Sequence, residues 1–169
     1  MFKGRIIIPF FNDKGRIYYY QGRKFNNEYG VKYLSRFGNH DVNIYNYYNV
    51  DMTKYVIILE GPIDAIFVEN AIALTGLKVS DKLVSDIPKK VFLLDNDISG
   101  NKKALKLLSK GNNVFIWEKF LKRYECSSEV KDVNDFVLYN KEGIIKLTLD
   151  IIKPFITNKS CDKIFFPVK

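Results

Sequence analysis

The sequence predicts an α/β protein with a mainly parallel sheet flanked by helices and a small β-rich subdomain at its N-terminus. All-apolar runs, typical of parallel strands covered on both faces, occur at "YVIIL" and "VFLL". Each run is followed by a glycine and then by a segment with apolar residues at helical spacing. The region upstream has β-rich runs around a turn signal instead, which indicates antiparallel strands.

The N-terminal β-rich region begins with "RIIIPFFNDKGRIYYYQGRKF", residues 5–25. Two β-rich runs surround "NDKG", where Gly15 can adopt the positive φ of a tight hairpin turn. Residues 26–49 are rich in Asn, Gly and Tyr without a sustained period, so we expect loops with a short strand at 31–34. Residues 1–53 are therefore expected to form a basic β-rich subdomain.

The α/β region is expected to follow over residues 54–140. The strand "YVIILEG" precedes "PIDAIFVENAIAL", which we expect to be a helix because its apolar residues recur at helical spacing. The strand "VFLLDNDISG" precedes a second helix, "NKKALKLLSKG", with Gly111 as a stop signal. A third strand is expected at "NVFIWEKF", and residues 141–169 are expected to be a C-terminal helix and tail.

The charge and cysteine content restrict the class of protein. Lys and Arg number 27 against 19 Asp and Glu among 169 residues, a formal charge of +8 that favours either simple solubility or a polyanionic partner. Only Cys126 and Cys161 are present, without CxxC spacing, which excludes a disulfide framework or a zinc ribbon within this sequence. Since no signal peptide or membrane-spanning run is apparent, we expect a cytoplasmic protein, in the host cytoplasm if phage-encoded, with no membrane partner.

Carboxylates follow the ends of the predicted parallel strands. Glu60 ends the first strand, Asp95 and Asp97 end the second, and Asp132 and Asp135 in "KDVNDF" follow the third. Because the carboxyl ends of parallel strands meet at one edge of a sheet, we expect these side chains to converge. Carboxylates held close together require a positive charge among them, and hard divalent cations such as Mg²⁺ prefer carboxylate oxygens.

Helix capping is the alternative explanation for each carboxylate alone. Asp97 is well placed to cap a helix beginning near Asn101, and Asp64 lies in a first helical turn, where it complements the helix dipole. Capping explains the whole set less well, because Glu-Gly-x-x-Asp and Asp-x-Asp-x-x-Gly occur at successive strand ends. Gly100 is expected to let the backbone turn sharply into the second helix.

Three acidic motifs resemble those of the topoisomerase-primase (Toprim) domain: "LEGPIDA" its glutamate motif, "LLDNDISGNKKAL" its paired-aspartate motif and "KDVND" its later acidic motif. Upstream, "RIIIPFFNDKGRIYYYQGRKF" and "VKYLSRF" are similar to the basic N-terminal part of the RNA polymerase domain of bacterial and phage DNA primases. The resemblance spans roughly residues 3–140 and implies a Toprim, Rossmann-like fold.

The resemblance implies roles for the acidic residues. Glu60, Asp95 and Asp97 match the catalytic carboxylates that bind metal, and Asp64 and Asp132 match acidic positions that surround them. The implied cofactor is Mg²⁺ or Mn²⁺. The resemblance therefore assigns a metal to the same residues whose convergence follows from the strand pattern.

It also implies roles for basic residues. Arg23 and Lys32 match positions that guide template or nucleotide, and Arg5 extends that surface. Lys102 and Lys103, which follow the paired-aspartate motif, are further candidates for binding nucleic acid or nucleotide. The implied partners of this surface are single-stranded DNA template and ribonucleoside triphosphates.

The implied activity is that of a nucleotidyltransferase, a primase-type DNA-directed RNA polymerase that uses magnesium to make short RNA primers in DNA replication. Cellular primases also carry a zinc-binding template-recognition domain and a helicase-binding domain, for which this sequence has neither the cysteines nor the length. We therefore expect a zinc domain, supplied in trans or by a missing segment, and a replicative helicase as partners.

Three other classes share parts of this pattern. A Toprim nuclease would use the same carboxylates to cleave a phosphodiester, but the N-terminal similarity favours a primase. A non-catalytic nucleic-acid-binding Toprim module would not need the intact set of Glu60, Asp95 and Asp97. A flavodoxin-like or response-regulator fold also has acidic strand ends, but it lacks the basic β region upstream.

Overall fold

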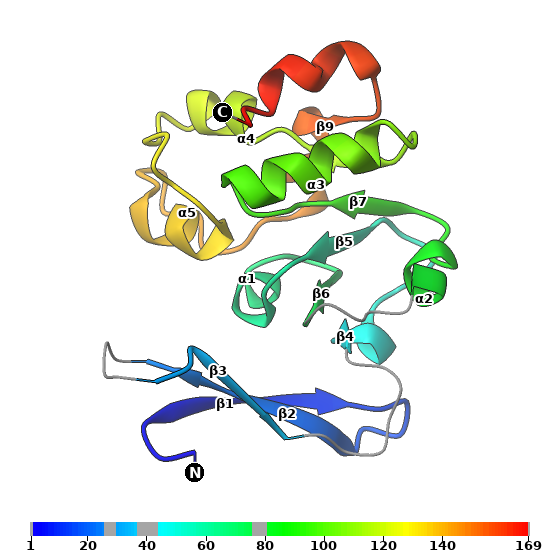
Figure 1. Cartoon of the computed structure of the whole chain (residues 1–169), viewed down its shortest axis with the longest axis vertical. Helices are drawn as coiled ribbons and strands as arrows, with labels where there is room; N and C mark the ends of the chain where they lie inside the picture. Colours follow the sequence, from blue (N-terminus) through cyan, green and yellow to red (C-terminus); the bar gives the residue numbers. More distant parts are fainter. Residues whose placement is uncertain (1, 26–29, 37–43, 76–80, 169) are drawn as a thin grey trace.

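The chain forms two β-sheets, one above the other in Figure 1, in a computed structural model that describes residues 2–25, 30–36, 44–75 and 81–168. The smaller sheet has the order β1-β2-β3 and the larger β4-β6-β5-β7-β8-β9. The strands are β1 (Arg5–Phe11), β2 (Ile17–Lys24), β3 (Tyr33–Arg36), β4 (Ile44–Tyr45), β5 (Val56–Leu59), β6 (Ala71–Leu74), β7 (Lys90–Phe92), β8 (Asn113–Phe115) and β9 (Ile156–Thr157).

The smaller sheet contains the predicted hairpin. β1 and β2 pair antiparallel, and Gly15 in the turn between them has a φ of +70°, as predicted. Asn12 stabilises the turn because its Oδ1 accepts hydrogen bonds from the backbone N of Lys14, at 3.0 Å, and of Arg16, at 2.9 Å. The short strand expected at 31–34 lies two residues further on, as β3.

The larger sheet has a parallel centre and antiparallel edges. β6, β5, β7 and β8 run parallel, which confirms the predicted sheet, while β4 pairs antiparallel with β6 and β9 with β8. The edge strands come from the segments expected to belong to the N-terminal subdomain and the C-terminal tail. The division at residues 53/54 and 140/141 stays a prediction.

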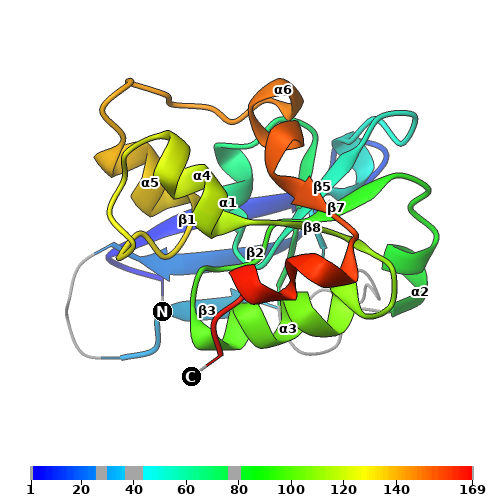
Figure 2. The same cartoon turned by 90° about the horizontal axis from the view of Figure 1, so that it is seen from above.

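Helices cover both faces of the larger sheet (Figure 2). Along β5, Ile57 and Leu59 pack toward α1, α4, α5 and α6, whereas Val56 and Ile58 pack toward α2 and α3. This alternation explains why the strand is apolar throughout. The helices are α1 (Pro62–Ile66), α2 (Asp81–Ser85), α3 (Ile98–Leu108), α4 (Trp117–Arg123), α5 (Val133–Tyr139) and α6 (Leu149–Ile152).

The helix expected over "PIDAIFVENAIAL" is wrong in its second half. α1 ends at Ile66, and Ala71–Leu74 form the parallel strand β6. Ala71, Ile72 and Ala73 are all buried, so the segment is covered on both faces and its apolar spacing did not distinguish helix from strand. Asn70, with a φ of 50°, provides the left-handed turn that starts the strand.

The third predicted strand is too long. β8 covers only Asn113–Phe115, and the rest of "NVFIWEKF" begins α4. Trp117 is buried there, and its indole N–H donates a hydrogen bond to the backbone O of Leu94 at 2.7 Å, which fixes the start of the helix against the sheet. Asp132 therefore follows a helix and a loop instead of a strand.

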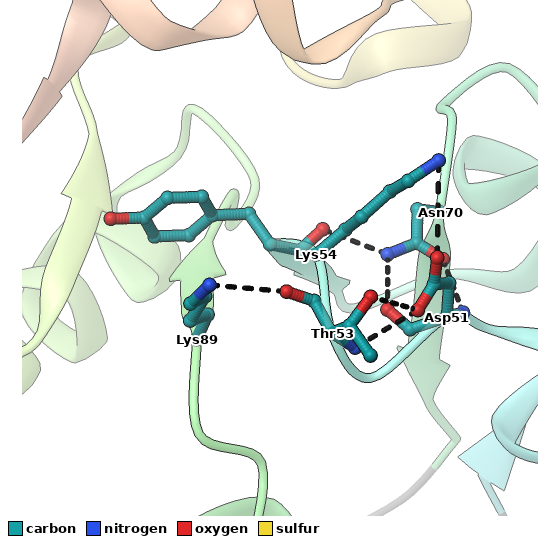
Figure 3. Close-up of polar contacts among 6 residues, drawn as sticks. Asp51, Thr53, Lys54, Asn70 and Lys89 are labelled. Atoms are coloured by element: carbon teal, nitrogen blue, oxygen red, sulfur yellow. Dashed lines mark hydrogen bonds and ion pairs between the residues drawn. The ribbon is translucent and has the colours of Figure 1, made fainter.

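A hydrogen-bonded network closes the loop at the N-terminal end of β5 (Figure 3). The Asn70 side-chain Nδ2 donates to the backbone O of Asp51 and of Tyr55, at 3.0 and 2.9 Å, and its Oδ1 accepts from the backbone N of Asp51 at 2.7 Å. Asp51 Oδ1 accepts from the backbone N and Oγ1 of Thr53, and Lys89 Nζ donates to the backbone O of Thr53. The polar groups of this network thus provide one another with hydrogen-bond partners.

The two sheets pack together through an aromatic cluster. Phe10 and Tyr19 of the smaller sheet are buried, and Tyr45 of β4 and Ile63 of α1 pack against the same cluster. The ring centroids of Phe10 and Tyr45 are 5.4 Å apart in an edge-to-face arrangement. This contact brings β2 and β3 close to the α1 end of the larger sheet. No helix within the described ranges has the length and apolar character needed to cross a membrane.

Candidate active site

The structure brings five of the predicted acidic residues to one edge of the larger sheet. Glu60 directly follows β5, and Asp95 and Asp97 follow β7, its parallel neighbour. Asp64 lies in α1 and Asp132 at the start of α5, and these two helices contact each other. The site is therefore assembled from two strand ends and two helix starts.

The pKa of Asp95 responds to the charges of the other four carboxylates. Burial, reinforced by the negative charges of Glu60, Asp64, Asp132 and Asp97, raises the pKa of Asp95 to about 7. A half-buried carboxyl group among four others is held in its charged form only at a cost. A cation at this position would remove that cost.

Asp64 shows the same effect at a second position. Burial and the charge of Asp132 raise the pKa of Asp64 to about 6, although a hydrogen bond from the backbone N of Asn134, at 3.0 Å, and the charge of Arg23 oppose the increase. Asp64 is 6% exposed. Its Oδ1 links α1 to α5 and so helps to hold Asp132 beside the strand ends.

Two of the five carboxylates are also helix caps, so the capping explanation is correct for them. Asp97 Oδ1 accepts a hydrogen bond from the backbone N of Gly100 at 2.7 Å, and Asp132 Oδ1 accepts one from the backbone N of Asp135 at 2.7 Å. Each cap uses one oxygen of a group that has two. Capping therefore orients these carboxylates and does not prevent a second role.

Gly100 is required for a reason that differs from the one predicted. It lies within α3 and is not among the residues with positive φ, so no special turn occurs there. A Cβ at this position would instead lie 1.9 Å from the backbone O of Asp95. The glycine allows α3 to approach the strand end closely, which places the Asp97 cap next to Asp95.

Glu60 is paired with Lys103 of α3. The ammonium group of Lys103 forms an ion pair with Glu60 Oε2, while Glu60 Oε1 is buried and has no hydrogen-bond partner among the described residues. No three Asp, Glu, His or Cys side chains in the described ranges are placed closely enough to hold a metal ion together. The unpartnered buried oxygen and the surrounding carboxylates nevertheless fit a hard divalent cation.

The smaller sheet contributes Arg23 to this edge. Its guanidinium donates to the Tyr33 hydroxyl at 3.2 Å and lies 5.7 Å from the centroid of that ring. The charge of Arg23 acts on Asp64. Burial raises the pKa of Tyr33, the charge and hydrogen bond of Arg23 oppose this increase, and the charges of Asp64 and Asp95 add to it. β2 and β3 thus face the carboxylates with a positive side chain.

Sequence relatives share one description. The DNA primase of Enterobacteria phage T4 is 33% identical over 144 residues, which are 82% of this chain and 39% of the phage protein. The DNA primase of Staphylococcus aureus (strain COL) is 30% identical over 139 residues, which are 68% of this chain and 22% of the relative. The chain thus spans less than half of the length of these relatives. No family model matches it.

Solved structures give the same result for the fold. The Escherichia coli primase catalytic core superposes with a TM-score of 0.58 at 15% identity, over 90% of this chain and 52% of that one. The chain is homologous to part of these DNA primases. The RNA polymerase domain of Mycobacterium tuberculosis primase, in complex with a double-stranded DNA oligomer with a 6-nucleotide overhang, has a TM-score of 0.60 at 15% identity over 82% of this chain and 50% of that one. The predicted fold is confirmed.

The other basic candidates of this primase homologue lie in different surroundings. The Arg5 guanidinium donates to the backbone O of Gly22, Val31 and Lys32, at 3.0, 3.0 and 3.3 Å, and so ties β1 to the segment that leads into β3. The side chains of Lys32 and Lys102 are exposed. A role of these three residues in binding nucleic acid stays a prediction.

Two residues of the primase homologue that support the site did not emerge as candidates from its sequence. Asn96 donates from Nδ2 to the backbone O of Val130 at 2.8 Å, and its backbone N donates to the backbone O of Lys131, which holds the loop before Asp132. Tyr33 positions Arg23. The position of Asn96 between Asp95 and Asp97 was a usable signal, whereas Tyr33 offered none.

Proposed function

We propose that this chain is the catalytic core of a primase that joins ribonucleotides on a single-stranded DNA template with a divalent cation, Mg²⁺ or Mn²⁺. The observation that carries the proposal is the convergence of four other carboxylates on Asp95, whose pKa is raised to about 7, in a homologue of DNA primases. The DNA in the complex of the M. tuberculosis domain supports a nucleic-acid template. The class of reaction is nucleotidyl transfer.

Glu60, Asp95 and Asp97 are the residues that would hold the metal, with Asp64 and Asp132 adding negative charge around them. When bound, a divalent cation neutralises triphosphate charge and lowers the pKa of an attacking hydroxyl. The cap hydrogen bonds of Asp97 and Asp132 hold these two carboxylates in fixed orientations, so little reordering is needed on binding.

The basic residues of the chain have complementary tasks. Lys103 neutralises Glu60, and its ammonium group would be available to a phosphate oxygen if Glu60 held a cation. Arg23, held by Tyr33, presents a guanidinium to phosphates that enter from the side of the smaller sheet. Both cations lie beside the carboxylates without belonging to the metal-binding set.

We also propose, from the resemblance, that a zinc-binding template-recognition domain and a replicative helicase act together with this core in the cytoplasm. The zinc domain would select the start site on the template, and the helicase would deliver single-stranded DNA. The two cysteines of this sequence lack CxxC spacing and cannot form a zinc ribbon, so the proposal assigns the zinc site to a partner or to a separate segment.

The test is a primer synthesis assay on single-stranded DNA with labelled ribonucleotides and Mg²⁺, with and without a separately supplied zinc domain. We expect short RNA products that disappear in excess chelator and in the variant Asp95→Asn. The exposed Asp150→Asn is the matched control and should retain activity. Shortened template without new RNA would instead identify a nuclease, and binding without any product would identify a non-catalytic module. Either result would refute the proposal.

A further inference from the structure

A groove with a cavity volume of about 430 Å³ lies between α2, β7 and α3, on the opposite face of the sheet from α1, α4 and α5. Its apolar lining consists of the buried Phe92 and Leu94 at the base and the half-buried Leu107 above them. The described residues that line the groove include four lysines and no aspartate or glutamate. An apolar base with a purely cationic rim suits a ligand that is flat and apolar in one part and anionic in another.

Three of the lysines form a row. Lys103, Lys106 and Lys110 are spaced by three and four residues along α3 and the turn that follows it, so they lie on one face of the helix. At a rise of about 1.5 Å per residue the row is roughly 10 Å long. Charges in a row match the consecutive phosphates of a nucleic-acid strand.

Two of these lysines are available for a ligand. The fourth lysine, Lys90, already donates from Nζ to the backbone O of Ser85 and Ile87, at 3.0 Å each. Lys106 and Lys110 are exposed, and their ammonium groups form no ion pair with any described residue. Complementing the dipole at the end of α3 would explain either of them, but not the cavity beside them.

The row also begins at the candidate active site. Lys103 lines the groove and at the same time forms the ion pair with Glu60. A strand that leaves the carboxylates along α3 would thus meet Lys103, then Lys106, then Lys110. The groove and the site are continuous through this one side chain.

We propose that this groove binds a single strand of DNA, with consecutive phosphates on Lys103, Lys106 and Lys110 and a base against the half-buried Leu107. The inference rests on the proposed function only in naming the strand as template. Binding itself requires neither metal nor catalysis, so it can be measured even if primer synthesis fails. The site is distinct from the Arg23 side of the carboxylates.

The test is fluorescence anisotropy of a labelled oligo-dT with the whole chain, without nucleotides, at several salt concentrations. We compare the double variant Lys106→Ala/Lys110→Ala with the control Lys122→Ala/Lys153→Ala, which removes the same charge from exposed positions away from the groove. The groove variant should bind about threefold to tenfold more weakly. Its slope of log K against log salt should be smaller by about 1.4, since each lost phosphate contact contributes about 0.7 for a single strand. The control should retain the wild-type slope.

Each other outcome overturns the proposal. An equal loss of affinity for oligo-dT in both variants means that only net charge matters. If the groove variant keeps the wild-type affinity, or if the wild type does not bind oligo-dT, the strand does not lie in this groove. A groove variant that loses affinity for a free nucleoside triphosphate but not for oligo-dT indicates a nucleotide site. Loss of affinity for a Glu-rich peptide alone indicates a protein partner. Circular dichroism confirms that the exposed lysine variants stay folded.

Discussion

The two ends of β5 carry polar clusters that differ in whether their polar groups have partners within the protein. At the N-terminal end, Asn70 and Asp51 form a closed network in which donors and acceptors pair (Figure 3). At the carboxyl end, Glu60 has a buried oxygen without a partner among the described residues, and Asp95 is surrounded by like charges. A closed network stabilises the fold, whereas an open cluster of charge requires a ligand.

The same residue type responds in opposite directions at the two ends. Hydrogen bonds from the side chain and backbone of Thr53 lower the pKa of Asp51. Burial and four neighbouring carboxylates raise the pKa of Asp95. An aspartate that serves structure is thus stabilised in its charged form, and one that serves a site is destabilised in that form until a cation binds.

Replacing Asp95 by Asn should have the largest effect on activity and an opposite effect on stability. We expect primer synthesis to fall roughly 10³-fold or more, because a proposed metal ligand is lost. Without divalent cation at pH 8, we expect the variant to be more stable by about 1–2 kcal/mol, because a half-buried charge among carboxylates is removed. Primer assays and urea unfolding measure the two effects. A variant that is both inactive and destabilised would contradict the metal-site interpretation.

Replacing Gly100 by Ala should damage the carboxyl end through the backbone. A Cβ would lie 1.9 Å from the backbone O of Asp95, so α3 or the strand end must shift. We expect a loss of about 3 kcal/mol or more in the free energy of unfolding, and a loss of activity even where the protein is folded. Ser99→Ala, next to it and exposed, is the control and should change neither. If Gly100→Ala had the wild-type free energy of unfolding, α3 would not approach the backbone of Asp95 as closely as described.

Replacing Asn70 by Ala should affect stability alone. The variant loses three hydrogen bonds and places Ala at a φ of 50°, so we expect about 2–3 kcal/mol of destabilisation by urea unfolding. Activity per folded molecule should stay at the wild-type level, because the network is at the opposite end of β5 from Glu60. Asn70→Asp keeps the acceptor for the backbone N of Asp51 but places a carboxylate oxygen against the backbone O of Asp51 and of Tyr55, so it should also destabilise the protein. A fall in the activity of folded Asn70→Ala would show that the two ends are coupled.

The convergence of the carboxylates could be predicted because it follows from topology. Runs of apolar residues identified β5 and β7, and parallel neighbours bring Glu60 and Asp95 to one edge in any such sheet. Capping by Asp97 could also be anticipated, since it depends on residues three apart. Local and topological rules were sufficient for these features.

Features that depend on long-range contacts could not be predicted. Residues 71–74 have an apolar pattern that is compatible with a helix or a strand. They form a strand because the segment is buried on both faces and because Asn70 makes a left-handed turn before it. Asn70 bonds to backbone groups 15 and 19 residues away in sequence, which no local pattern reveals. The charge of Arg23 acts on Asp64 because the two sheets pack together, and the contact of Phe10 with Tyr45 is part of that packing.

The smallest expected effect is the pH dependence of stability without divalent cation. The pKa values of Asp64 and Asp95 are raised in the folded protein to about 6 and about 7, so between about pH 4 and 7 the unfolded chain binds fewer protons than the folded one. Stability should therefore fall as the pH rises through this window, by about 1–2 kcal/mol after solvent screening, and then level off. Asp51, with its lowered pKa, loses its contribution to stability only as the pH falls below about 4, so it does not act in this window.

Urea unfolding from pH 5 to 8 with chelator measures the fall in stability, and Mg²⁺ should restore stability more at pH 8 than at pH 5. A smaller fall in Asp95→Asn would assign the effect to the carboxyl end of β5, and an unchanged fall would assign it elsewhere.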